Sequence, residues 1–148
     1  MPHFGLMDER GLEPEAAALQ RARLHIRAGR RRLRQGKTAA GWMTLYDALL
    51  FAMAWYVASP DRRQTLPIRK TDNLRDDAFL FDLLQNAGVV PKGFDYGAFK
   101  ALVYSPRPEE TPGYDPGNTL KALETLMTRL GVLPFDEGSL PPEDPATY

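Results

Sequence analysis

The chain has 148 residues, enough for one domain with its own hydrophobic core, and no cysteine, which excludes disulfides, thiolate catalysis and cysteine-ligated metal clusters. Its 19 basic and 19 acidic side chains cancel, but residues 1–74 carry 13 basic and 7 acidic side chains, whereas residues 75–148 carry 6 and 12. This asymmetry predicts either attraction between the two halves or a basic face that is open to an acidic partner. The N-terminal residues lack the apolar core of a secretory signal, so we expect a cytoplasmic protein.

A first helix is predicted over residues 13–34. It follows residues 1–12, which we expect to form a flexible leader because glycine and proline interrupt their apolar residues. Pro14 suits the first turn of a helix, and Gly36 offers a stop. Apolar residues recur every seven positions, a spacing typical of a helix that packs through one narrow seam. These residues are Leu12, Leu19, Ile26 and Leu33.

Basic residues gather on one flank of this predicted helix. Between residues 21 and 37 the chain has eight basic side chains and no acidic one. Three interpretations are open: a solvated face partly balanced by the acidic half of the chain, a surface for phosphate groups or nucleic acid, and a surface for the carboxylates of a protein partner. We call the following residues the arginine flank: Arg23, Arg27, Arg30, Arg31, Arg34 and Lys37.

The most apolar stretch is residues 42–57, in which only Thr44 and Asp47 are plainly polar. A helix that is apolar on nearly every side must be enclosed by other elements. The stretch is short for a membrane span and carries an acid near its middle, so we expect a buried central helix and no membrane association. The connection at residues 36–38 is so short that the first and central helices must form an antiparallel hairpin.

Within that hairpin, His25 and Asp47 are predicted to lie opposite each other, because both stand eleven residues from Gly36. A carboxylate can orient and charge an imidazole, as it does in acid/base sites, but a buried pair that only satisfies its own polar groups is commoner. We therefore predict a polar pair and assign it no catalytic role.

More helices are predicted after the hairpin. A polar loop over residues 59–73 leads to a helix that Thr71, Asp72 or Asn73 caps and that continues to about Ala87. Apolar residues at helical spacing place this helix in the core.

A short helix over residues 96–104 and a last helix over residues 118–130 follow, separated by a proline-rich loop. The predicted fold is therefore all-α, a four- to five-helix bundle over residues 13–133 that is built on the antiparallel helical hairpin. Residues 134–148 are rich in proline and acid, and we expect them to form an extended or disordered tail.

Motifs of catalysis and cofactor binding are missing. The sequence has no phosphate-binding loop, dinucleotide-binding glycine motif, zinc-protease motif or nucleophile elbow. With His3 and His25 as the only histidines, we expect no histidine-rich metal site. The acids Asp76, Asp77 and Asp82 are interpreted as the solvent side of a helix. We therefore expect no cofactor, no metal and no catalytic residue.

The hairpin has the sequence ARLHIRAGRRRLRQGKTAAGWMTLYDALLFAMAWYV, with a cationic first helix, a glycine-bearing turn and an alanine- and tyrosine-rich second helix. In these features it resembles the HEPN superfamily of small α-helical domains. The later stretch YSPRPEETPGY and the final helix loosely follow the family layout, so the resemblance covers roughly residues 15–130.

Many HEPN members are ribonucleases with an arginine, four to six further residues and then a histidine, late in the domain. Here no histidine follows His25, and Arg21 and His25 are separated by three residues on the wrong helix. The resemblance therefore implies a non-catalytic member that binds nucleic acid, a nucleotidyltransferase-like partner or a copy of itself.

One face of the central helix predicts self-association. It carries Met43, Phe51 and Trp55 near Asp47, and a monomer would expose these large side chains to water. A second copy would cover them in a two-fold homodimer and would bring two arginine flanks together. The alternative is that the short fourth helix or the leader covers this face.

We interpret the chain as a non-catalytic helical binding module that contacts nucleic acid or an acidic protein partner through the arginine flank. The alternative is an atypical or degenerate HEPN-like ribonuclease. A binding module shifts the mobility of RNA or of a partner without consuming it, whereas a nuclease cleaves RNA and loses cleavage when His25 is changed.

Overall fold

The computed structural model describes residues 12–148, and within this range the chain is all-α, which confirms the predicted fold class. The predicted leader lies outside the described residues except for Leu12. No helix in the described part is both long enough and apolar enough to cross a membrane. The helices are α1 (Pro14–Arg34), α2 (Thr38–Ala58), α3 (Pro60–Arg63), α4 (Asp77–Asn86), α5 (Tyr96–Tyr104) and α6 (Pro116–Leu130), with short 3₁₀-helices η2 (Pro108–Glu110), η3 (Glu137–Ser139) and η4 (Pro145–Thr147).

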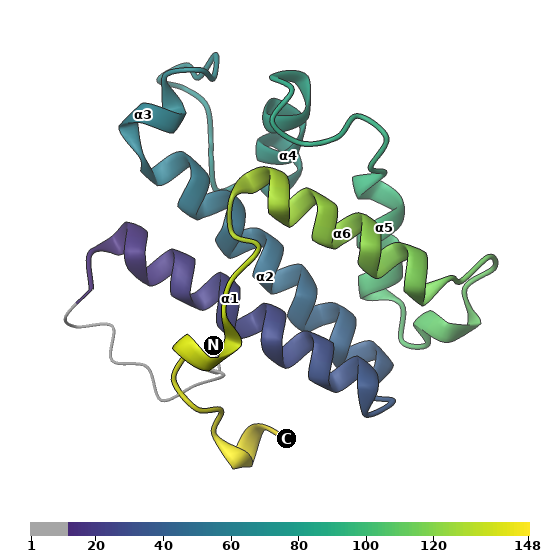
Figure 1. Cartoon of the computed structure of the whole chain (residues 1–148). Coiled ribbons are helices and arrows are strands. Elements are labelled where there is room, and N and C mark those ends of the chain that lie inside the picture. The colour runs from purple at the N-terminus through teal and green to yellow at the C-terminus, as the bar shows by residue number, and fades with distance from the viewer. Residues whose placement is uncertain (1–11) are drawn as a thin grey trace.

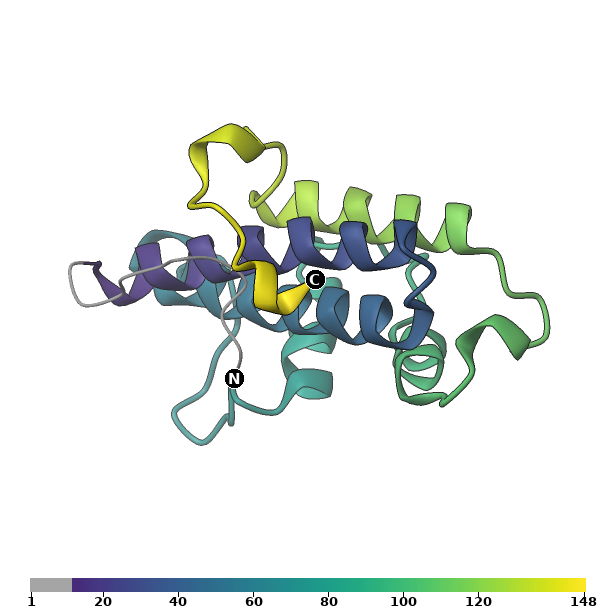
Figure 2. The ribbon, with the colours of Figure 1, turned by 90° about the horizontal axis from the view of Figure 1, so that it is seen from below.

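Helix α2 lies in the middle of the bundle (Figures 1 and 2) and contacts each of the other five α-helices of the described chain. Its core side chains Trp42, Leu45 and Leu49 are at most 1% exposed. The most apolar stretch of the sequence therefore forms the central helix, because only the middle of the bundle can enclose a helix that is apolar on nearly every side.

The α1–α2 hairpin is closely packed through two glycines. A Cβ added to Gly29 would lie 2.5 Å from Cγ of Leu45, and one added to Gly41 would lie 2.7 Å from Cδ2 of Leu33. A side chain at either position would overlap the facing leucine, so the glycines let the two helices approach. At the turn, Gly36 has φ 76°, in the left-handed region that favours glycine.

The connection between α2 and α4 differs from the predicted loop in two ways. It contains the one-turn helix α3, and α4 begins at Asp77, later than predicted, because the side chain of Asp76 caps it. One of the predicted caps has another role, since Asp72 Oδ2 accepts a hydrogen bond from the backbone N–H of Arg69 at 2.8 Å. This connection is therefore held by local hydrogen bonds.

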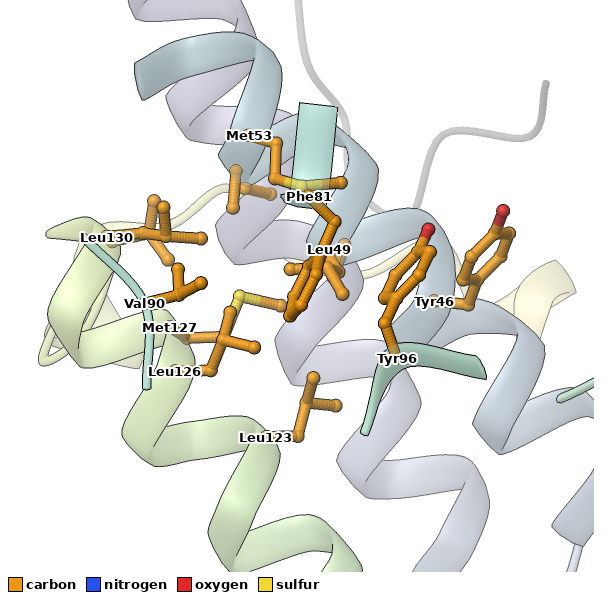
Figure 3. Close-up of a cluster of buried hydrophobic side chains, with 14 of the residues drawn as sticks. Tyr46, Leu49, Met53, Phe81, Val90, Tyr96, Leu123, Leu126, Met127 and Leu130 are labelled. Atoms are coloured by element: carbon orange, nitrogen blue, oxygen red, sulfur yellow. The ribbon is translucent and has the colours of Figure 1, made fainter. Parts of the chain in front are cut away.

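One side of α2 is covered by α4, α5 and α6, whose apolar faces meet in a single core (Figure 3). The rings of Phe81 and Tyr96 stack at 4.4 Å between centroids. Leu126 and Met127 of α6 point toward them and are at most 1% exposed. Because these three helices occupy this side of α2, α1 packs against another side and keeps its basic flank outside the main core.

After α6 the chain turns back at Gly131, and residues 132–148 cross α1 (Figures 1 and 2). We call these residues the C-terminal segment. Its Leu140 packs against the buried side chains of Leu24 and Ala28 on α1. The segment is extended apart from η3 and η4, and it is docked on the bundle.

Candidate binding surface on helix α1

The arginine flank lies on the part of α1 that faces the C-terminal segment. Arg23 Nε donates to the backbone oxygen of Val132 at 3.1 Å, and Arg27 Nη2 donates to that of Pro141 at 2.6 Å. The Arg23 guanidinium also lies 5.6 Å from the ring centroid of Phe135. These contacts join two turns of α1 to the passing chain.

Arg30 connects α1 to two different elements. Its Nη2 lies 2.6 Å from Oε2 of Glu124 on α6, and its Nη1 lies 3.6 Å from Oε1 of Glu137 in the C-terminal segment. All three side chains are partly exposed, so each pair contributes less than about 1 kcal/mol to stability. Their role is to complete the charge complementarity between α1 and the acidic half of the chain.

Arg31 makes a well-shielded ion pair with the C-terminal segment. Its Nε lies 3.2 Å from both carboxylate oxygens of Glu143, and its Nη2 donates to the carbonyl of Thr147 at 3.2 Å. The Arg31 and Glu143 side chains are each 12% exposed, and the guanidinium lies 4.7 Å from the ring centroid of Tyr148. A charge-assisted contact with so little solvent is stronger than an exposed ion pair.

The structure adds Arg32, which the sequence did not single out. Its Nη1 donates to Thr44 Oγ1 of α2 at 3.0 Å, and its Nη2 donates to the Thr147 carbonyl at 3.4 Å. Burial and then the charge of Arg31 lower the pKa of Arg32, and Glu143 opposes both. Its position away from the row of other arginines on a helical wheel explains why periodicity alone did not identify it.

The last two members of the arginine flank, Arg34 and Lys37, are exposed near the α1–α2 turn. Within residues 12–148 their side chains make no hydrogen bond or ion pair. Arg34 borders a shallow hollow with Leu33 and Leu120. The structure thus divides the predicted site into four arginines that the chain itself engages and two cations that stay open.

His25 and Asp47 lie in the same hairpin, but among the described residues no hydrogen bond or ion pair joins them. His25 is 1% exposed, its Nδ1 lies 2.8 Å from the carbonyl oxygen of Arg21, and its ring centroid lies 5.1 Å from that of Phe51. Asp47 is half-buried, and loss of solvation raises its pKa. In the described structure His25 therefore contacts a backbone carbonyl of its own helix and an aromatic ring of α2.

The face of α2 that motivated the predicted homodimer is partly covered within one copy of the chain. The guanidinium of Arg62 lies 3.8 Å from the ring centroid of Trp55, and that of Arg21 lies 5.5 Å from the ring of Phe51. Met43 packs against the main core. None of these three apolar side chains is fully exposed, so this face gives a weaker reason for self-association than the sequence suggested.

A polar cluster that the sequence analysis missed joins α2, α4 and α5. Asp77 Oδ2 accepts hydrogen bonds from the hydroxyls of Tyr46, at 2.8 Å, and Tyr96, and lies 3.0 Å from Lys100 Nζ. The sequence pattern indicated that Asp77 faces solvent, whereas in the structure its carboxylate contacts side chains of two other helices. The sequence holds no signal for the cluster because its members come from three helices.

The charges and hydrogen bonds of this cluster suit a structural role, which is to hold α2, α4 and α5 together. Burial alone would raise the pKa of Asp77, but the three hydrogen bonds outweigh it and lower the pKa to about 2. Burial, followed by the hydrogen bond to Asp77, raises the pKa of both Tyr46 and Tyr96 above the usual tyrosine range. Both phenols therefore stay protonated as donors, and at neutral pH the cluster has no group poised to exchange a proton.

No group of three or more acidic or histidine side chains in the described part of the chain is arranged to hold a metal ion. Comparison of the chain with protein-family models, with curated proteins and with solved structures gave no match. The arginine flank with its docked segment is a candidate binding surface.

Proposed function

We propose that this chain is a non-catalytic helical binding module whose arginine flank recognises an acidic, extended protein segment. The observation that supports this proposal is that the flank already holds such a segment, residues 132–148 of the same chain. Carboxylates of Glu137 and Glu143 and carbonyls of Pro141 and Thr147 meet its guanidinium groups.

The chemistry of the contact favours a particular kind of partner. Proline keeps a chain extended and leaves its carbonyls free of intrachain hydrogen bonds, and guanidinium groups can donate to those carbonyls. Leu140 adds an apolar anchor against α1, followed directly by Pro141 and by Glu143 two residues later. A partner with an apolar residue, prolines and an acid in this order would match both the charge and the shape of the surface.

The natural candidate for the partner is a second copy of the chain, because each copy carries this segment. We propose a homodimer in which two copies exchange their C-terminal segments, an arrangement that makes the same contacts between chains as within one. The absence of cysteine fits a reducing compartment, and we propose the cytoplasm.

The HEPN-like assignment is also a proposal, supported by the closely packed hairpin with its cationic first helix. The alternative of an atypical HEPN-like ribonuclease has less support, because His25 is 1% exposed and a phosphodiester could not reach it in this conformation. Nucleic acid as the partner of the arginine flank has less support as well, because four of its arginines contact protein groups.

A peptide competition experiment tests the proposed function. In the wild-type chain the tethered C-terminal segment occupies the arginine flank at an effective concentration of about a millimolar. A labelled peptide of residues 136–148 must compete with that segment, so it should bind weakly. The full chain with Glu137→Gln and Glu143→Gln should bind that peptide at least about tenfold more tightly, because its own segment competes less. Fluorescence anisotropy of the peptide measures the difference.

The matched control is Glu109→Gln with Glu110→Gln, which removes the same charge from exposed positions outside the surface. It should bind the peptide as the wild-type chain does. Adding Arg27→Gln and Arg31→Gln to the first variant should abolish binding. A first variant that fails to bind the peptide, or binding that survives loss of both arginines, would contradict recognition by the flank. Binding of RNA that is lost with Arg27→Gln and Arg31→Gln would favour the nucleic-acid interpretation of the flank.

A further inference from the structure

A hollow of about 540 Å³ lies where the end of α2 meets α3 and the connection to α4. Its cationic lining residues are Arg63, Arg69 and Lys70, and its apolar wall includes Leu66 and Ile68. These residues belong to the stretch that the sequence indicated as a polar loop, and none of them is part of the arginine flank.

The three cations of the hollow are available to a ligand. Each is exposed, and within residues 12–148 none of their side chains makes a hydrogen bond or an ion pair. This distinguishes them from Arg23, Arg27, Arg30 and Arg31, which contact the acidic half of the chain. This hollow therefore brings together three positive charges that no ion pair within residues 12–148 neutralises.

The walls of the hollow are held in place by groups that do not use its charges. Arg62 stacks on Trp55, donates to the carbonyls of Trp55 at 2.6 Å and Tyr56 at 2.9 Å, and pairs with Glu15 at 2.6 Å. These bonds fix α3 to the end of α2. On the other side, Leu66 is 7% exposed and anchors the connection in the core. The site is thus supported before any ligand arrives.

No carboxylate lines the hollow, and the nearest acids along the chain, Asp61 and Asp72, are not among its walls. Three like charges around one concavity repel one another and attract an anion. Two guanidinium groups offer paired N–H donors that match the oxygens of a phosphate, and an ammonium group adds a point charge.

We propose that this hollow binds phosphate groups, supplied either by a compact polyphosphate such as that of a nucleotide or by the backbone of single-stranded RNA. Binding here is separate from recognition of a protein segment by the arginine flank, because the two sites share no residue. Each site can therefore be removed without the other.

Binding is measured with two probes on the full chain: a fluorescein-labelled oligouridylate by anisotropy and inorganic tripolyphosphate by calorimetry. If RNA neutralises all three cations, the logarithm of affinity should fall with the logarithm of salt at a slope of about −2, which is roughly a twentyfold loss between about 50 and 200 mM salt. The variant Arg63→Gln, Arg69→Gln, Lys70→Gln should lose at least about tenfold in affinity and most of this slope.

The matched control is Lys92→Gln, Arg107→Gln, Lys121→Gln, which removes the same net charge from exposed positions outside the hollow. It should bind both probes nearly as the wild-type chain does. Binding of RNA alone assigns the site to a nucleic-acid backbone, and binding of tripolyphosphate alone assigns it to a compact ligand. No binding of either probe at low salt, or equal losses in the two variants, overturns the proposal.

Discussion

Replacing Gly29 with alanine tests how the α1–α2 hairpin is held together. The new Cβ would lie 2.5 Å from Cγ and 2.7 Å from Cδ2 of Leu45, well inside the roughly 3.5–4.0 Å at which carbon atoms attract. Leu45 is 1% exposed and cannot swing into solvent, and its backbone nitrogen lies 3.3 Å from the same point. The substitution must therefore displace a core side chain or separate the helices.

Overpacking of this kind costs about 1–3 kcal/mol, and the higher helix propensity of alanine offsets about 0.5–1 kcal/mol of that cost. We expect a net loss of about 1–2 kcal/mol in the free energy of unfolding, measured by urea denaturation with an unchanged m-value. Gly97→Ala is the control, because the nearest atom to its Cβ lies at an ordinary 3.5 Å. That variant should be as stable as the wild type or more stable.

A double-mutant cycle identifies the cause. In a Leu45→Ala background the clash partner is gone, so Gly29→Ala should become neutral or stabilising, with a coupling of about 1–2 kcal/mol between the two positions. A Gly29→Ala protein as stable as the wild type, or an equal loss of stability in both backgrounds, would refute steric overlap with Leu45 as the cause.

Two further predictions concern the polar cluster and the oligomer. Because the folded pKa of Asp77 is about 2 against an ordinary value of 3.8, its stabilising contribution is present above about pH 4 and lost as the pH falls toward 2. The urea midpoint of the wild type should therefore fall over that pH range, and it should fall less in Asp77→Asn. Asp82→Asn, which removes an exposed acid, should show the same fall as the wild type. If the midpoint depends on pH equally in both variants, the cluster does not stabilise the fold through the charge of Asp77. Sedimentation equilibrium at high micromolar concentration should give a dimer that dissociates in the Glu137→Gln, Glu143→Gln variant, whereas a wild-type species of 16.6 kDa alone would reject the homodimer.

The hairpin and the central helix could be predicted because their signals are local. The apolar run at residues 42–57 and the short turn at Gly36 both depend on neighbouring residues in the chain. The start of α4 was misplaced because several capping residues stand close together, and only the fold selects Asp76 among them. Local patterns thus identified elements better than their boundaries.

Contacts between distant parts of the chain could not be predicted in the same way. The spacing of the arginines placed Arg23, Arg27 and Arg30 on one flank, but it held no information about the C-terminal segment that contacts all three. The C-terminal segment has no hydrophobic periodicity, so its docking depends on single contacts such as Arg31 with Glu143. The charge asymmetry between the two halves of the chain was the only sequence signal of this contact, and it did not specify the residues.

The position of the C-terminal segment also has a consequence during protein synthesis. Helix α1 is complete once Arg34 has been made, but Glu143 and Thr147 are added only after more than a hundred further residues. At roughly 5 to 20 residues per second, the carboxylates and carbonyls of residues 132–148 reach the guanidinium groups of α1 only about 5 to 20 s later, on the ribosome, an assembly rich in RNA. The nascent chain therefore passes through a stage of net positive charge, which ends only when residues 132–148 fold back over α1.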